Sequence, residues 1–149
     1  MMIVTIQPIN FIYFVAEPIC DDSSAILRMA DQLYREAYDW RMPACGAIQC
    51  HYQKDPLNVH SPRFNIALPV QSFAGNYDGV CHFKRTDLYR CVLTVHHGPL
   101  TLLAEARRKL TESALCDGLC LSHNDRDVQV VFDVQDPSAN ITMVQVGVA

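Results

Sequence analysis

The chain has 149 residues, half of them hydrophobic, which is enough for one domain or for two small modules that pack together. Its formal net charge of -4 at pH 7 argues against a nucleic-acid-binding surface, because such surfaces are strongly basic. The apolar N-terminus lacks a basic region and is interrupted by Gln7, Pro8 and Asn10, so we expect neither a signal peptide nor a membrane span.

The first half of the chain is predicted to contain four strands and one helix. Alternating, β-branched or aromatic residues predict the strands at residues 3–7, 11–16, 47–52 and 63–70. Residues 24–40 are predicted to be helical because their apolar side chains fall on one stripe, formed by Ile26, Met29, Ala30, Leu33, Ala37 and Trp40. Polar residues and prolines predict a turn at 54–56 and a loop from there to residue 62.

The second half is predicted to contain the same elements. Strands are expected at residues 80–84, 89–97, 128–134 and 141–149. A helix is expected at 99–114, because Gly98 permits a tight turn and Pro99 suits the first helical position. Residues 116–127 are predicted to form a loop, and residues 135–140 a turn.

Both halves therefore show the order strand, strand, helix, strand, strand, which indicates an internal duplication with a repeat of about 80 residues. Residues 71–79 are polar and show no period, so they are predicted to link a first module at 1–70 to a second module at 80–149. The predicted fold class is α+β, with tandem ββαββ modules that carry one long helix each.

Segments from both halves resemble one known family. They are TVHHGPLTLL (94–103), the Asp136-Pro137 turn and the final strand, together with AIQCHYQKDP (47–56) and NIALPV (65–70). In these segments the chain resembles the GyrI-like small-molecule-binding domain, the effector-binding domain of AraC-type and multidrug-responsive bacterial transcription activators. The resemblance implies SHS2-like modules with antiparallel sheets, related by a pseudo-two-fold axis. It also implies a cleft between the modules that receives an aromatic, often cationic, ligand.

The chain departs from that family at an acidic position. Members usually carry a Glu on the strand before the Asp-Pro turn, where this chain has Val131. Asp133 shares a strand face with that position and is the first choice for a carboxylate in the cleft, ahead of Glu17 and Glu105. The chain also shows no helix-turn-helix segment, so the resemblance is to a sensor without a DNA-reading half.

A ligand cleft needs an apolar wall with a few placed polar groups. The candidates for that wall are aromatic residues from both halves: Tyr13, Trp40, Tyr52, Phe64 and Phe132. Any one of them is more simply explained as core, whereas the set as a whole, drawn from both halves, favours a ligand-binding wall.

His96 and His97 are adjacent, so a strand points them to opposite faces. One is expected to shape the turn before the helix and the other to reach the cleft. We assign the cleft role to His96, and Asp133 completes the predicted ligand site.

Metal binding and catalysis find weaker support. The seven cysteines are scattered through apolar segments, which is typical of free thiols in a reducing cytoplasm. Two loose patterns of metal-binding residue types occur, Cys116, Cys120 and His123 in one and Cys45, Cys50 and His51 in the other. Zinc sites need a fourth ligand and usually tighter spacing, so we predict no metal and no cofactor. The G-x-S-x-G, P-loop and G-x-G-x-x-G patterns do not occur.

These observations favour a stand-alone, cytoplasmic module that binds a small aromatic or cationic compound, without direct contact to nucleic acid or a membrane. A hydrolase of reactive small molecules on the same fold is the first alternative, with Asp133, Glu17 or Glu105 as its acid. A protein-interaction module is the second alternative, such as a gyrase inhibitor or the detached sensor of a separate regulator. A second copy of the chain, as a homodimer, is a further candidate partner.

Overall fold

The computed structural model describes residues 2–16, 23–55 and 58–149. The first half contains β1 (Val4–Ile6), β2 (Asn10–Ala16), α1 (Ser23–Asp39), β3 (Gln49–Asp55) and β4 (Asn58–Val70). The second half contains β5 (His82–Arg85), β6 (Tyr89–His97), α2 (Leu103–Cys116), β7 (Leu121–Val131) and β8 (Ile141–Val148). Single 3-10 turns at Leu100–Leu102 and Pro137–Ala139 precede α2 and β8. The predicted α+β class is confirmed.

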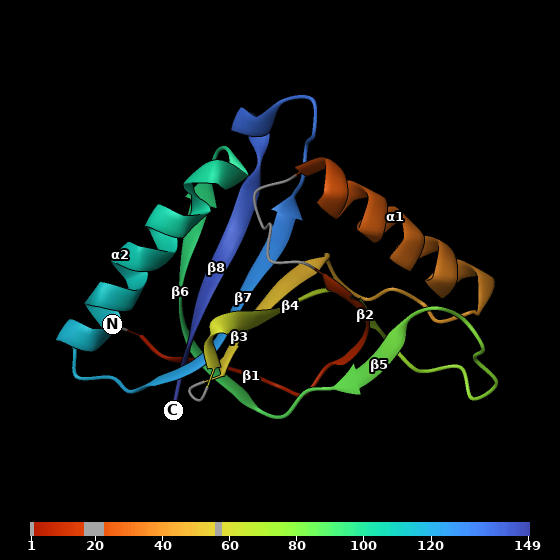
Figure 1. Cartoon of the computed structure of the whole chain (residues 1–149), viewed down its shortest axis with the longest axis horizontal. Coiled ribbons are helices and arrows are strands. Elements are labelled where there is room, and N and C mark those ends of the chain that lie inside the picture. The colour runs from red at the N-terminus through yellow and green to blue at the C-terminus, as the bar shows by residue number, and fades with distance from the viewer. Residues whose placement is uncertain (1, 17–22, 56–57) are drawn as a thin grey trace.

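The strands form one antiparallel sheet of eight strands in the order β1-β6-β8-β7-β3-β4-β2-β5 (Figure 1). Each strand of the first half has a counterpart at the same position in the second half, such as β1 and β5 or β3 and β7. Exchanging every strand for its counterpart reverses this order and otherwise leaves it unchanged. The sheet therefore has pseudo-two-fold symmetry, with the axis at the contact between β3 and β7.

The two halves exchange their first strands. β1 pairs with β6 of the second half, and β5 pairs with β2 of the first half. The segments that follow these two strands bond to each other: the Ile9 N–H donates to Thr86 Oγ1 (3.1 Å), and the Thr86 N–H donates to the Ile9 carbonyl (3.0 Å). The module limits at 1–70 and 80–149 follow the sequence repeat and stay a prediction. In the sheet, each half contains three strands of one unit and the first strand of the other unit.

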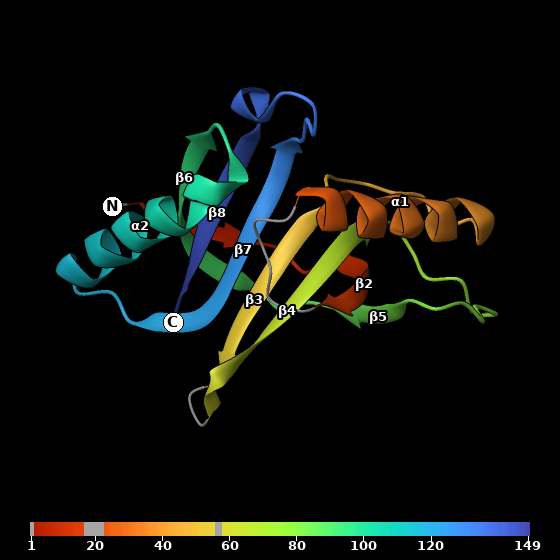
Figure 2. The same cartoon turned by 45° about the horizontal axis from the view of Figure 1, so that its top comes forward.

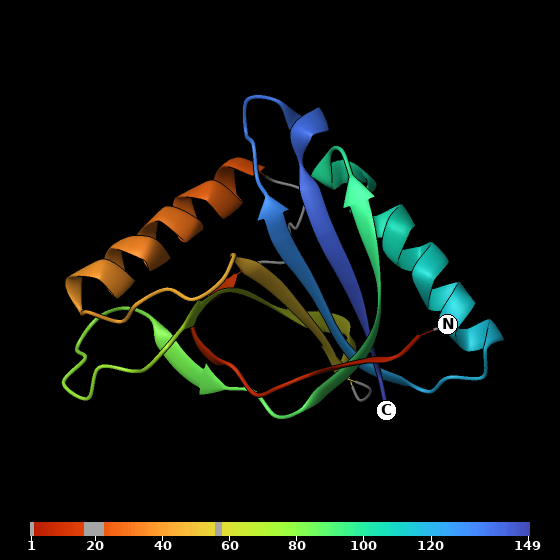
Figure 3. The ribbon, with the colours of Figure 1, turned by 180° about the vertical axis from the view of Figure 1, so that it is seen from behind.

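Both helices pack on the same face of the sheet, α1 against β2 and β4 and α2 against β6 and β8 (Figures 1, 2 and 3). Their buried positions follow the helical period, with Ile26 and Leu33 on α1 and Leu103 and Leu110 on α2. These side chains meet inward-facing strand residues such as Ile66, Leu68, Val92, Val144 and Val146. Each such large aliphatic side chain contributes about 1.5–3 kcal/mol by leaving water. Within the described ranges, no helix is long and apolar enough to cross a membrane.

Two predicted loops are wrong. The segment 116–127 contains more than half of β7, which begins at Leu121 and ends at Val131 rather than at residue 134. The segment 54–62 continues β3 and β4 on either side of residues 56–57, which lie outside the described residues. Both segments are polar, so the apolar alternation that marks the other strands is missing there. For β7, pairing with β3 on one side and β8 on the other supplies the backbone hydrogen bonds.

Candidate functional site

Polar side chains gather on the helix face of the sheet where β3 meets β7. The register pairs Cys50 with Asp127 and Tyr52 with Asp125. Cys50 belongs to the core beneath the helices, so the residues on its face, Tyr52, Asp125 and Asp127, point toward the helices as well. The candidate site therefore lies on the symmetry axis, between the two helices.

Arg107 of α2 reaches across to this junction. Its guanidinium carbon lies 4.4 Å from the centre of the Tyr52 ring. Its Nη2 donates to Asp127 Oδ1, and its Nε lies 3.7 Å from Asp125 Oδ2. The Asp127 side chain is fully buried, and the Arg107 side chain is 17% exposed. We call these four residues, Tyr52, Arg107, Asp125 and Asp127, the cation site.

Burial and charge act in opposite directions on these groups. Burial lowers the pKa of Arg107, but the neighbouring Asp127 carboxylate more than offsets it, so the pKa is raised and the guanidinium stays charged. Burial raises the pKa of Asp125, although the Gly147 N–H, which donates to its Oδ1 (3.2 Å), and the charge of Arg107 oppose that shift. The cation site is thus a buried ion pair with a second carboxyl group beside it.

The ion pair leaves two polar atoms unsatisfied. In the described part of the chain, Asp127 Oδ2 and Arg107 Nε are buried and have no hydrogen-bond partner. A guanidinium can bind a carboxylate through two parallel hydrogen bonds, whereas here only one forms to Asp127. The carboxylate therefore retains an open acceptor in a place from which water is largely removed.

An aromatic wall stands beside the carboxylate. The rings of Tyr52 and Phe64 lie 5.0 Å apart with an interplanar angle of 39°, and Phe64 is buried. On the neighbouring strands, buried Thr142 donates from Oγ1 to Gln129 Oε1 (3.1 Å). The junction thus combines ring surface, a negative group and a satisfied polar pair.

The structure distributes the predicted aromatic residues over several regions. Tyr52 and Phe64 lie together at the cation site. Trp40 packs against Tyr77 beyond the end of α1, with ring centres 5.1 Å apart. Tyr13 lies on the opposite face of the sheet. Phe132 is partly buried against the core just beyond β7.

The predicted polar groups also lie apart from one another. His96 contacts the Pro99 carbonyl through Nε2 at 3.2 Å, where β6 turns into α2. Asp133 Oδ1 accepts from the N–H groups of Gln135 (2.9 Å) and Asp136 (3.0 Å), so this carboxylate organises the turn after β7. Glu105 pairs with Arg108 on the exposed side of α2, and Glu17 lies outside the described residues. The ligand-binding role of the predicted set stays a prediction.

Sequence reasoning missed Arg107, Asp125 and Asp127. The signal for the two carboxylates was present, because Asp125, Asp127 and Gln129 alternate with the period of a strand face. The signal for Arg107 was its place on the same helical stripe as Leu103 and Leu110. The signal of the carboxylates was obscured because 116–127 was interpreted as a loop.

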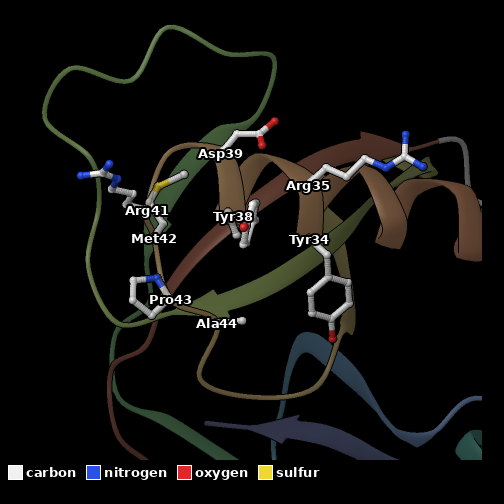
Figure 4. A pocket seen from close by; sticks show the side chains of 9 residues that line it. Tyr34, Arg35, Tyr38, Asp39, Arg41, Met42, Pro43 and Ala44 are labelled. Carbon is white, nitrogen blue, oxygen red and sulfur yellow. The ribbon is translucent and has the colours of Figure 1, made fainter.

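Two other features of the surface were candidates for a site, an open hollow beside α1 and the exposed Cys and His residues near the end of α2. A hollow of about 630 Å³ lies beside the C-terminal end of α1, where Figure 4 shows Tyr34, Tyr38 and Met42 around it. Tyr38 is 85% exposed, so this hollow is an open depression. Among the described residues, no three or more His, Cys, Asp or Glu side chains are placed to hold a metal ion. Cys116, Cys120 and His123 are all exposed.

Known structures share this fold. Neither a family model nor a curated protein sequence matches the chain. The C-terminal domain of EcmrR matches with a TM-score of 0.76 and 18% identity over 99% of this chain and 96% of that domain. In a complex of EcmrR with DNA, the match has a TM-score of 0.73 and 18% identity, and it covers 99% of this chain and 56% of the EcmrR chain.

Two further neighbours match over 99% of this chain. A hydrolase from Listeria innocua has a TM-score of 0.70 and 13% identity, with 91% of its chain covered. SAV2435 bound to tetraphenylphosphonium has a TM-score of 0.63 and 9% identity, with 93% of its chain covered. The resemblance to the GyrI-like domain is thus confirmed at the level of the fold.

Proposed function

We propose that the chain is a ligand-binding domain that takes aromatic cations at the cation site. The observation that carries this proposal is the buried Asp127 carboxylate, which is neutralised by Arg107, a side chain that is itself a flat cation and that lies over the Tyr52 ring. Arg107 occupies the position that such a ligand would take, and it makes the contacts that the ligand would make. The ligand would displace the guanidinium and keep Asp127 paired.

This exchange predicts a preference for cations over neutral aromatic compounds. An unpaired carboxylate in a buried position costs several kcal/mol, so a neutral ligand that displaced Arg107 would bear that cost. A cation would avoid it and would also gain about 0.5–2 kcal/mol from the face of Tyr52. Arg107 is attached by a long side chain and is partly exposed, so it has a path to solvent when it leaves.

The comparison with SAV2435 supports the class of ligand, since that protein was captured with tetraphenylphosphonium, an aromatic cation. The proposal includes binding of several such compounds. It also includes a separate regulator or a second copy of the chain as partner, and a cytoplasmic location. The cysteines at positions 45, 81, 91, 116 and 120 are free thiols, the form that a reducing compartment maintains.

Calorimetric titration at pH 7 tests the proposal with tetraphenylphosphonium and the neutral triphenylphosphine oxide. We expect the cation to bind at least about tenfold more tightly to the wild type, the preference that about 1.4 kcal/mol gives. Asp127→Asn should lose this preference, whereas Asp31→Asn, the same change on the exposed face of α1, should keep it. A folded Asp127→Asn protein that still prefers the cation would refute the assignment.

Arg107→Ala provides a second test, which remains informative if Asp127→Asn folds poorly. Without the guanidinium, tetraphenylphosphonium becomes the partner of Asp127, so the ligand should raise the melting temperature more than in the wild type. Arg108→Ala is the matched control, because Arg108 pairs with Glu105 and Glu112 on the exposed side of α2. An equal rise in all three proteins would count against the exchange of Arg107 for the ligand.

A hydrolase is the second candidate function. Burial raises the pKa of Asp125, and a carboxyl group of this kind at the edge of a site can transfer protons. The hydrolase from Listeria innocua shows that the fold occurs among proteins described as hydrolases. Product formation from an electrophilic aromatic substrate that is lost in Asp125→Asn, with ligand binding retained, would favour this candidate.

A further inference from the structure

The face of the sheet opposite the helices carries basic side chains that the cation site does not use. His51 of β3 and Arg126 of β7 are paired in the register, and Lys84 of β5 reaches His51. These three residues, the basic cluster, line a hollow of about 290 Å³ that Tyr89 borders. Because neighbouring strand residues point to opposite faces, the sheet separates the basic cluster from Asp127.

Arg126 is buried and has no acidic partner. Its side chain is packed so that the residue is only 8% exposed, and its guanidinium carbon lies 3.8 Å from the centre of the Tyr89 ring. It makes no hydrogen bond or ion pair with any residue in the described ranges. Burial lowers the pKa of Arg126, yet a guanidinium remains charged in proteins. Its N–H groups are therefore available at the wall of the hollow.

Lys84 adds a second cation whose partners are neutral. Its Nζ donates to His51 Nδ1 at 2.9 Å and lies 4.7 Å from the centre of the Tyr13 ring. With the Asn65 amide turned so that both its ends are satisfied, Nζ also donates to its oxygen at 3.3 Å. Burial, then the charge of Arg126, lowers the pKa of Lys84 to about 8, so the amine is largely protonated at neutral pH.

His51 is held neutral and fixed in one tautomer. Since Lys84 donates to Nδ1, the proton of the ring lies on Nε2, which donates to Gln49 Oε1 at 2.8 Å. Burial, and then the charges of Lys84 and Arg126, lower the pKa of His51 well below its usual range. The ring thus orients the Lys84 amine and adds no charge to the basic cluster.

The nearby carboxylates do not neutralise this cluster. Asp125 borders the hollow, but its Oδ1 accepts from the Gly147 N–H and its Oδ2 lies 3.7 Å from Arg107 Nε. Asp87 stands on the rim and is exposed, as is Arg85 beside it. Within the described residues, neither carboxylate forms an ion pair with Lys84 or Arg126. Lys84 and Arg126 therefore share one hollow without a carboxylate paired to either of them in the described part of the chain.

We propose that the basic cluster binds a small oxyanion, a carboxylate or phosphate group, between Arg126 and Lys84. The guanidinium offers a planar pair of N–H donors that matches such a group, and the ammonium adds a point charge beside it. The volume lies at the lower end of ligand pockets, which are typically about 300–1,000 Å³, so it suits a compact anion. This site is independent of the proposed cation site.

Titration with inorganic phosphate and with acetate tests the proposal. Binding is monitored by the NMR chemical shifts of backbone amides, and the ionic strength is held constant with chloride as the balancing anion. We expect saturable shifts at residues of β3, β5 and β7 around the hollow. The phosphate arm and the acetate arm show which oxyanion is preferred. Arg126→Gln should weaken binding at least about tenfold, since it removes the charged fork.

Three further proteins make the result decisive. Arg90→Gln changes an exposed arginine that donates to the Ala149 carbonyl, and it should bind as the wild type does. Lys84→Gln should also weaken binding, and it keeps the test informative if Arg126→Gln folds poorly. Asp127→Asn should leave anion binding unchanged, which separates this proposal from the cation site. Absence of saturable shifts with both anions, or undiminished binding in Arg126→Gln and Lys84→Gln, would overturn the proposal.

Discussion

The two faces of the sheet at the β3–β7 junction carry the same motif with opposite charge balance. On the helix face, Arg107 lies 4.4 Å from the Tyr52 ring centre and has Asp127 and Asp125 beside it. On the opposite face, Arg126 lies 3.8 Å from the Tyr89 ring centre and has no carboxylate partner among the described residues. The aromatic contact is thus common to both faces, and the carboxylates are present on one.

This difference decides what each face can accept. Where the carboxylates outnumber the arginine, a cation can replace the guanidinium and leave the net charge of the site unchanged. Where two cations stand together, an anion is the group that balances the charge. Buried charges in proteins are normally balanced, so the charge in excess on each face predicts a ligand of the opposite sign.

The same substitution on both faces would break the comparison most strongly. Arg107→Met leaves Asp127 buried and unpaired, so we expect the free energy of unfolding to fall by about 3–5 kcal/mol. Arg126→Met removes a buried charge that has no carboxylate partner, so we expect a change within about 1 kcal/mol. Urea unfolding of the two variants and the wild type measures both values.

A double variant checks the cause of the larger loss. Arg107→Met with Asp127→Leu removes both charges and fills the space with apolar groups, so most of the lost stability should return. If the two single variants lose the same stability, or if the double variant does not recover, the contrast in charge balance between the faces is wrong.

Gly147 tests how the opposite face is built, with a smaller expected effect. A Cβ on Gly147 would clash with the Asn124 carbonyl oxygen. Asn124 lies in the bulged part of β7, next to His123 with its φ of 63°. That carbonyl accepts the hydrogen bond of the Tyr89 hydroxyl (2.8 Å), which steadies the ring beneath Arg126. Gly147→Ala should therefore cost about 1–3 kcal/mol in unfolding free energy and weaken anion binding.

Gly75→Ala is the control for that experiment, because nothing lies within 4 Å of its added Cβ. We expect its unfolding free energy and its anion affinity to stay near those of the wild type. Unchanged anion binding in Gly147→Ala would show that the bulge does not position the basic cluster.

The sequence predicted the repeated order of elements because apolar periodicity marks nearly all of them. β6, predicted at 89–97, matches at both ends, and the stripe of α1 is buried at Ile26, Ala30, Leu33 and Ala37. The strand exchange was not predictable, because pairing between distant strands leaves no local pattern. The cation site was missed for a related reason: its carboxylates lie on a strand with a polar inner face, which local propensity describes as a loop.

The pH dependence of stability gives the smallest expected effect and isolates Lys84. Its pKa is about 8 in the folded chain, below the ordinary value of 10.5, so between these values the unfolded chain binds the proton that the folded chain has released. Stability from this group therefore rises with pH from about 8 to about 10.5. Because Lys84 is only partly buried, we expect about 1–2 kcal/mol.

Urea unfolding of the wild type and of Lys84→Met at pH 7.5, 9 and 10 measures this effect. The comparison cancels the titration of groups that both proteins share, such as Tyr89, because burial raises the pKa of Tyr89 in both. The free energy of unfolding of the wild type should increase relative to Lys84→Met across that range. The same comparison in an Arg126→Met background should show a smaller increase, because the charge of Arg126 contributes to the lowered pKa of Lys84. A flat difference in both backgrounds would mean that Lys84 is not held between His51 and Arg126 as a desolvated amine, and the face opposite the helices would then lack the second cation that its anion site requires.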